Sequence, residues 1–167
     1  MTTKPEVAVS PDARQMLRHT VATVAYRGGK SLRGAPASFA SFTCGESTRT
    51  PSHILAHIGD LYDWALTIAQ GNEAWATATP LAWDDEAKRF FATLKKFDEY
   101  LESGKPLHAS AERIFQGAIA DSLTHVGQLN MMRRMAGSPV KGESYYRSEI
   151  VAGRVGPEQT APKREFD

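Results

Sequence analysis

The sequence predicts an all-α fold, most simply a four-helix bundle. Apolar residues recur with the 3.6-residue period of an amphipathic helix in four separate segments. Few stretches alternate with a period of two, and none is bounded by turn residues as a β-hairpin would be. At 167 residues the chain suits a single domain. We expect the bundle core to span residues 11–137, followed by an irregular tail over 138–167.

The first helix is expected over about 11–26, because the glycine pair Gly28-Gly29 would stop it. A polar connection over 28–49 follows, long enough to be a crossover between the first and second helices. The second helix has a clear start, since Thr50 can cap its free N–H groups and Pro51 occupies the first helical position.

The second helix should end at Gly71. The third begins near Asp84 or Asp85, because acidic residues suit a helix N-terminus, and ends before Ser103. The fourth runs over about 110–136 and is closed by the Gly-Ser-Pro sequence that follows. The tail is rich in glycine and proline, with one short helical turn expected over 148–151.

Two helices of this prediction carry polar residues on apolar faces. Asp121 and His125 lie one turn apart on the fourth helix, and His57 falls on the apolar stripe of the second. A buried carboxylate facing buried imidazoles must be paired, protonated or bound to a cation. Two neutral imidazoles and one carboxylate form a three-ligand metal set that leaves coordination positions open. The simpler alternative is an Asp121–His125 hydrogen bond that satisfies both groups.

Other polar residues are assigned lesser roles. His53 is expected to be solvated or to cap the second helix, and Asp60 and Asp63 to be exposed, with Asp60 a candidate acceptor for a ring N–H of His57. Cys44 is expected to be a bystander, with a thiol nucleophile as the alternative. The basic pair Arg133-Arg134 is expected on a solvated helix surface.

Composition excludes several functional classes. The formal net charge of +1 and the absence of a basic stripe with interleaved aromatics exclude a nucleic-acid partner. No apolar stretch approaches the roughly 20 residues needed to cross a bilayer, and the N-terminal segment lacks the apolar region of a signal peptide. We therefore expect a cytoplasmic protein without a membrane partner. There is no phosphate-binding glycine loop and no G-x-S-x-G nucleophile elbow.

Three segments resemble the DinB-like superfamily of damage-inducible, metal-binding four-helix bundles. The segment 50-TPSHILAHIGDLYDW-64 resembles the second-helix segment that bears the first ligand histidine. The segment 121-DSLTHVGQLNMMRRMAG-137 resembles the fourth-helix segment, and 143–167 resembles the ending of one branch of the family. The resemblance implies a divalent metal bound by His57, Asp121 and His125. Asp121 stands where the family usually has histidine, which leaves the metal open among Zn, Ni, Mn and Fe.

The resemblance also implies a range of activities. Characterised members include bacillithiol or mycothiol transferases and maleylpyruvate isomerase-like proteins. We therefore expect a metal-dependent enzyme that uses a metal-activated water or thiol for hydrolysis or thiol transfer on a small-molecule substrate, with a low-molecular-weight thiol as a candidate partner. Gln128 is a candidate to orient a ligand, and Glu143, Tyr145 and Tyr146 are candidates to cover the mouth of the site. The alternative is a non-catalytic bundle that binds a structural metal or holds a structural Asp–His pair, or that self-associates, for instance as a homodimer.

Overall fold

The computed structural model describes residues 4–167 and is mostly helical, which confirms the all-α class. The helices and strands have the following bounds: α1 Pro11–Leu32, α2 Pro51–Ala69, α3 Trp83–Glu102, α4 Ala111–Ile114, α5 Ala120–Met135, β1 Gly142–Glu143 and β2 Glu165–Phe166. Short 3-10 helices span Ala37–Ser41 and Tyr145–Arg147, and a π-helical turn, Phe115–Ile119, joins α4 to α5.

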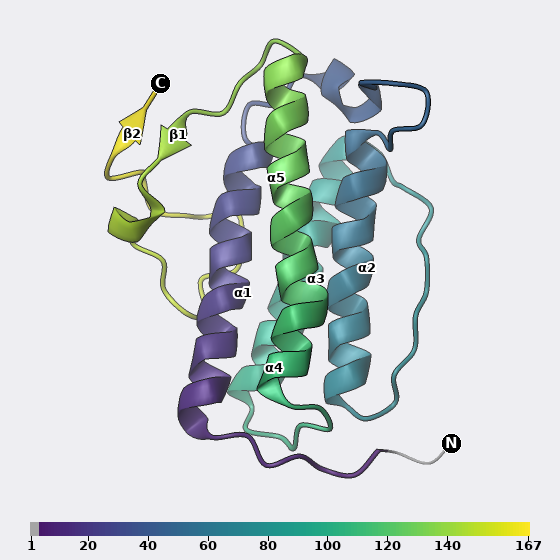
Figure 1. The fold of residues 1–167 in the computed structure, drawn as a ribbon, viewed down its shortest axis with the longest axis vertical. Helices are drawn as coiled ribbons and strands as arrows, with labels where there is room; N and C mark the ends of the chain where they lie inside the picture. The colour runs from purple at the N-terminus through teal and green to yellow at the C-terminus, as the bar shows by residue number, and fades with distance from the viewer. Residues whose placement is uncertain (1–3) are drawn as a thin grey trace.

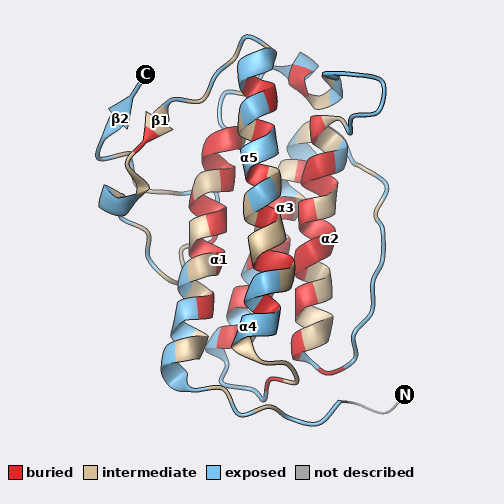
Figure 2. Cartoon of the chain, in the orientation of Figure 1, coloured by how far each residue is buried: buried red, intermediate tan, exposed pale blue. Residues whose placement is uncertain are grey.

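The four long helices run lengthwise through the molecule (Figure 1). In this view α5 lies between α1 and α2, with α3 behind them, and each of these helices contacts at least two of the others. Their inward faces are buried, as the red segments of Figure 2 show. The largest fully buried side chains are aromatic and aliphatic: Tyr26, Tyr62, Phe39, Phe90, Phe97, Leu55, Ile58, Leu94, Leu101, Leu107, Ile114 and Ile119. A single core therefore forms where these faces meet.

The glycine pair does not end the first helix, contrary to the sequence prediction. Gly28 and Gly29 lie inside α1, which continues to Leu32. A Cβ atom added at Gly28 would lie 2.5 Å from the ring of Phe90, and one at Gly29 would lie 3.3 Å from Phe91. The pair thus allows the backbone of α1 to approach the aromatic face of α3, and this packing offsets the low helix propensity of glycine.

The predicted start of the second helix is confirmed. Thr50 accepts a hydrogen bond from the backbone N–H of His53, and Pro51 is the first helical residue. The helix ends at Ala69, and Gly71 follows with a φ of 81°, a left-handed conformation that favours glycine. The end of α5 is similar, because Gly137 follows it with a φ of 74°.

The prediction that Arg133 lies on a solvated helix surface is wrong, because this residue is buried. Its side chain is 5% exposed, and its guanidinium donates hydrogen bonds to the carbonyl oxygens of Ser31, Arg33 and Gly34 at 2.8–3.2 Å. These carbonyls lie at the C-terminal end of α1, where helical partners run out. A side chain of α5 therefore caps α1, whereas the neighbouring Arg134 is exposed.

The tail packs beside α1 (Figure 1) and is more ordered than predicted. Its two short strands pair antiparallel, and its helical turn lies at 145–147 instead of 148–151. Glu143 anchors this segment, since it accepts hydrogen bonds from Tyr26 at 2.6 Å and from Lys30 at 2.7 Å. Lys30 also pairs with Glu165 at 2.6 Å, so both strands are tied to α1.

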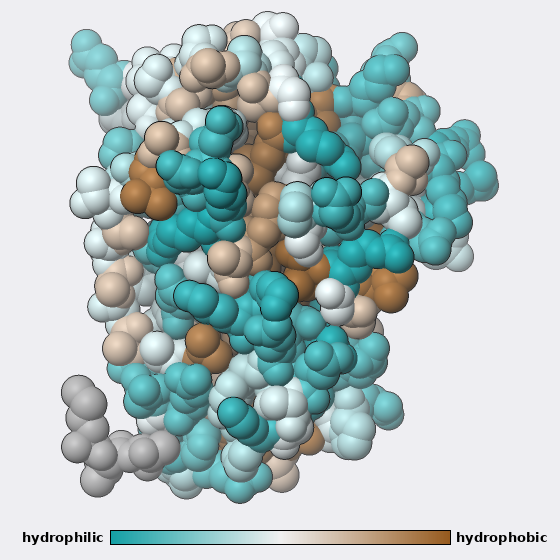
Figure 3. Space-filling view, turned by 180° about the vertical axis from the view of Figure 1, so that it is seen from behind, coloured by the Kyte–Doolittle hydropathy of each residue, from teal (hydrophilic) through white to brown (hydrophobic). Residues whose placement is uncertain are grey.

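The outer surface shown in Figure 3 is mostly hydrophilic, with hydrophobic side chains in separate spots and along a central depression. Among the helices of residues 4–167, none combines the length and apolar character that crossing a membrane requires.

Candidate metal centre

His57 is positioned by the capped start of α2. The helix begins at Pro51, so His57 lies near the end of its second turn, on the side that faces α5. His53, one turn earlier, is exposed, and its ring Nδ1 lies 2.7 Å from the hydroxyl of Thr50. His53 thus belongs to the helix cap, as predicted, and His57 alone of the two approaches α5.

Asp121 and His125 follow an irregularity that the sequence pattern did not reveal. The predicted continuous helix over 110–136 contains the π-helical turn Phe115–Ile119, immediately before α5. Such a turn accommodates an extra residue, so the faces of α4 and α5 are out of register. Gly117 in this turn lies beside Trp64 of α2, where an added Cβ atom would be 3.6 Å from the indole. The shift sets which face of α5 carries Asp121 and His125.

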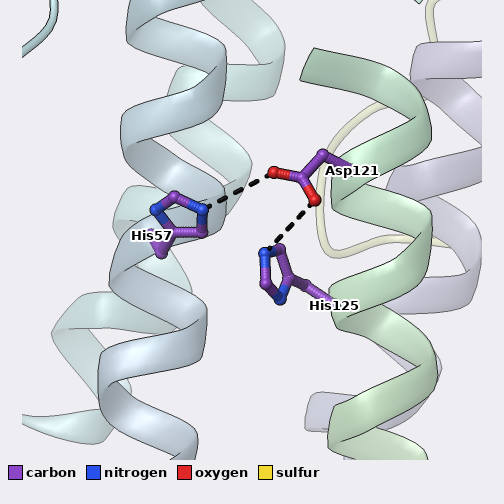
Figure 4. Close-up of side chains that lie close together, drawn as sticks. All are labelled: His57, Asp121 and His125. Atoms are coloured by element: carbon purple, nitrogen blue, oxygen red, sulfur yellow. Dashed lines mark ion pairs between the residues drawn. The ribbon is translucent and has the colours of Figure 1, made fainter. Parts of the chain in front are cut away.

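The three predicted residues lie together between α2 and α5 (Figure 4). One ligand atom from each residue can be chosen so that all three atoms lie within 4.8 Å of one another. The carboxylate of Asp121 points one oxygen to Nε2 of His57, at 3.6 Å, and the other to Nε2 of His125, at 3.5 Å. Both distances exceed those of ordinary N–H···O hydrogen bonds. The alternative of a simple Asp121–His125 hydrogen bond therefore has little geometric support.

The site is more exposed than the sequence predicted. The side chains of His57 and His125 are 21% and 13% exposed, and that of Asp121 is 46% exposed. The buried stripe of α5 instead comprises Ser122, Val126, Leu129, Met132 and Arg133. The register shift at the π-helical turn accounts for the difference, so the three residues lie at the edge of the core and not within it.

Gln128 orients the ring of His125. Its side-chain oxygen lies 2.8 Å from Nδ1 of His125. A hydrogen bond with the Gln128 oxygen as acceptor requires the proton on Nδ1, which leaves the lone pair on Nε2, the atom that faces Asp121. This tautomer is the one that a metal ligand needs, and it agrees with the orienting role predicted for Gln128.

His57 lies against an aromatic wall that the sequence did not predict. Its ring centroid is 5.6 Å from that of Trp75, which in turn packs 5.7 Å from Trp64. Burial, then the nearby His125 and the charge of Arg49, lower the pKa of His57 below its ordinary value, although Asp121 acts in the opposite direction. The imidazole of His57 is therefore held in its neutral form, which is the form that binds metals.

Several predicted contributors lie elsewhere. Asp60 is not exposed and does not contact His57: it is 4% exposed and accepts hydrogen bonds from Arg89 at 2.5 Å and from the backbone N–H of Ala78 at 3.1 Å. Asp63, half-exposed, also pairs with Arg89. Arg89 of α3 thus pairs with both of these acidic residues of α2, and residue type alone does not distinguish this use from metal binding.

The tail does not cover the mouth of the site. Glu143 is bound to Tyr26 and Lys30 of α1. The ring of Tyr145 packs edge-on against Tyr26, 6.4 Å between centroids, and Tyr146 is 98% exposed. The prediction that these tail residues cover the site is wrong. The tail packs on α1, whereas His57, Asp121 and His125 lie between α2 and α5.

A pocket of about 610 Å³ opens beside the two imidazoles. It is lined by His57, His125 and Gln128, by Ile54 and three methionines of α5 (Met131, Met132, Met135), and by Cys44, Thr48 and Arg49 of the connection between α1 and α2. Cys44 is exposed and free. The sequence did not predict this pocket, because its walls come from three segments far apart along the chain.

Comparison with protein-family models, with curated proteins and with solved structures finds no match to this chain.

Proposed function

We propose that His57, Asp121 and His125 bind a divalent metal ion and that the protein is a metal-dependent enzyme acting on a small molecule. The observation that carries the proposal is the convergence of three ligand atoms, from two helices, within 4.8 Å of one another. It lies beside a pocket of about 610 Å³, which suits a small-molecule substrate.

The donor set fits a divalent ion. Ligand atoms at about 2.1 Å from a metal are separated from one another by roughly 3–4 Å, and Asp121 lies 3.6 Å and 3.5 Å from the two imidazoles. The half-exposed carboxylate has room to adjust its rotamer. Two imidazoles and one carboxylate suit Zn, Ni, Mn or Fe, and the Gln128 contact supplies the outer hydrogen bond that metal-binding histidines generally have.

The surroundings favour an open site over a closed structural one. A structural zinc site is usually closed by four protein ligands. The neighbouring histidine and aspartate of α2 are committed elsewhere, His53 to Thr50 and Asp60 to Arg89, and Cys44 is not part of the cluster of ligand atoms. Within residues 4–167, one cluster of this kind is found, and it holds three residues. Remaining coordination positions would then face the pocket and be available to water or substrate.

The chain's own residues have defined roles in this proposal. A bound divalent ion would lower the pKa of a water or a thiol, which supplies a nucleophile near neutral pH for hydrolysis or thiol transfer. His57 and His125 bind as neutral imidazoles, Asp121 adds negative charge, and Gln128 fixes the ring of His125. Trp75 shields one side of His57 from water.

Membership of the DinB-like superfamily remains part of the proposal. It is supported by the resemblance of 50–64 and 121–137, by the four long helices lying side by side, consistent with a four-helix bundle, and by the place of the two segments on facing helices. The substitution of Asp121 for the usual histidine is compatible with metal binding because carboxylate is a competent ligand.

Elemental analysis of protein purified without chelator tests the metal site. We expect about one metal ion per chain in the wild type and loss of metal in His57→Ala, Asp121→Ala and His125→Ala. His19→Ala is a matched control, because His19 is exposed on α1. Because the three residues lie at the edge of the core, each variant should change the metal-free unfolding free energy by no more than about 1 kcal/mol. Wild-type protein that binds no metal after reconstitution with Zn, Ni, Mn or Fe would refute the proposal.

The second candidate is a non-catalytic metal-binding bundle that self-associates as a homodimer. It shares the metal site with the first, so metal content does not separate them. A screen of the metal-loaded protein for hydrolysis and thiol transfer, with Asp121→Ala as the inactive reference, separates them directly. Concentration-dependent dimerisation without turnover would favour this second candidate.

A further inference from the structure

The residues that line the pocket beside the two imidazoles indicate which kind of molecule fits it. Ten residues line it, and of these only Arg49 has a permanent charge. Arg49 is exposed, and among residues 4–167 no acidic side chain pairs with it. Other arginines of this protein are used internally, as Arg89 and Arg18 are by carboxylates and Arg133 by carbonyl oxygens. Arg49 therefore retains a guanidinium that is free to bind an anion.

One wall of the pocket is apolar and adaptable. Met131 and Met135 are 59% and 54% exposed, so two large apolar side chains face solvent next to one another at this pocket. Together with Met132 and Ile54 they form the apolar wall of the pocket. Methionine is flexible and polarisable, so such a wall adapts to the shape of a bound apolar group.

The electrostatic balance also favours an anion. The proposed site would combine a divalent cation with one carboxylate, Asp121, and two neutral imidazoles, for a net charge of about +1. Arg49 adds a further positive charge. The pocket also borders the first turns of α2, whose N-terminal end carries a partial positive charge.

From these observations we propose that the pocket binds a small molecule with an apolar body and a carboxylate, with Arg49 pairing with the carboxylate and the methionine wall of α5 receiving the apolar body. A carboxylate suits a single guanidinium, because the planar fork of arginine matches its two oxygens. As the substrate class of the candidate enzyme this inference rests on the proposed function, but the pocket itself can be tested without metal.

The test uses three compounds that share one apolar body and differ in charge: 4-phenylbutyrate, 4-phenylbutan-1-ol and 4-phenylbutylamine. Calorimetric titrations are made with the full chain, once freed of metal and once loaded with zinc. In both forms we expect the carboxylate to bind about tenfold more tightly than the alcohol, as for one charge-assisted contact at an exposed site. The amine should bind more weakly than the alcohol.

Two pairs of variants assign the contacts. Arg49→Gln should remove the preference for the carboxylate, whereas Arg147→Gln, at an exposed arginine in the tail, should retain it. Met131→Gln should weaken the binding of all three compounds severalfold. Met16→Gln is the matched control, because Met16 lies on α1 with an exposure of 62%, close to the 59% of Met131.

The outcomes separate this inference from the proposed function. A carboxylate preference that depends on Arg49 in the metal-free protein supports the inference even if the triad binds no metal. The inference is overturned if the acid and the alcohol bind equally, if none of the three compounds binds, or if the preference survives Arg49→Gln. A preference that is confined to zinc-loaded protein and survives Arg49→Gln would place the carboxylate on the metal and equally overturn the role of Arg49.

Discussion

Two polar clusters of this protein use similar residue types in opposite ways. Between α1 and the tail, Glu143 is enclosed and accepts hydrogen bonds from Tyr26, Lys30 and Ser148 at 2.6–2.7 Å. Between α2 and α5, the carboxylate of Asp121 is 46% exposed and its nearest imidazole nitrogens lie at 3.5 Å and 3.6 Å. The first cluster satisfies its own charges, and the second leaves ligand atoms converging on a common point. The first arrangement stabilises the fold, whereas the second is compatible with the proposed metal site.

The largest effect is expected when the Glu143 cluster between α1 and the tail is broken; this cluster satisfies its own charges and is called the satisfied cluster below. Glu143→Ala leaves Lys30 with its charge buried at 7% exposure and removes the acceptor of Tyr26. Loss of one partner of a buried ion pair costs about 3–5 kcal/mol, and Glu165 partly compensates Lys30. We expect the free energy of unfolding to fall by about 3 kcal/mol, measured by urea denaturation. Glu158→Ala, at an exposed position, is the control, and an equal effect of the two variants would contradict the assigned role.

Buried backbone groups should give the next largest effect. Arg133→Ala leaves the carbonyl oxygens at the end of α1 without donors, and we expect a loss of about 2 kcal/mol in the free energy of unfolding. Arg134→Ala should change it by less than about 0.5 kcal/mol. Urea denaturation of both variants measures the contrast directly. Equal losses would show that the carbonyl contacts of Arg133 do not stabilise the fold.

The satisfied cluster should also make stability depend on pH. Burial opposes ionisation of Glu143, but hydrogen bonds from Lys30, Ser148 and Tyr26 outweigh it, so its pKa lies below the ordinary value of 4.5. This contribution is fully present above pH 4.5 and is lost as the pH falls through the lowered pKa. For Lys30, burial is outweighed by Glu143 and Glu165, which raise its pKa above 10.5, so its contribution is lost as the pH rises through that raised pKa.

The measurement is the difference in unfolding free energy between wild type and Glu143→Gln from pH 3 to pH 7. The difference should be largest near pH 7 and shrink in acid, because protonation removes the charge that the variant lacks. A difference that stays constant over this range would show that shape and not charge holds the tail on α1.

The smallest effect is expected at the hydrogen bond between Gln128 and His125, which orients one of the candidate metal ligands. Gln128→Ala removes the acceptor at Nδ1 of His125, and loss of such an outer hydrogen bond should weaken metal binding about tenfold. Competition with a chromophoric chelator measures the affinity. Gln15→Ala, exposed on α1, is the control. Gln128→Glu, which keeps an acceptor, should retain binding, and loss in both variants would point to a role other than orienting the ring.

Several elements could be predicted from the sequence because their causes are local. The start of α2 depends on Thr50 and Pro51, which act on the neighbouring turn alone. Gly137 ends α5 through its own backbone conformation. The choice of His57, Asp121 and His125 followed from their residue types on helix faces, although their exposure did not, because no local signal marked the π-helical turn that shifts the register.

Other features depend on partners that are distant along the chain. The low helix propensity of Gly28 and Gly29 predicts that the first helix ends there. The helix instead continues through them, because Phe90 and Phe91 pack against the pair. Arg133 and Arg134 are the same residue type at adjacent positions, yet only Arg133 faces the end of α1. The sequence by itself thus determined the helical class, the start of α2, the glycine that follows α5 and the candidate metal ligands, since these follow from short-range geometry. Only the tertiary structure decided which charges are satisfied and which are left free, because that depends on contacts between helices.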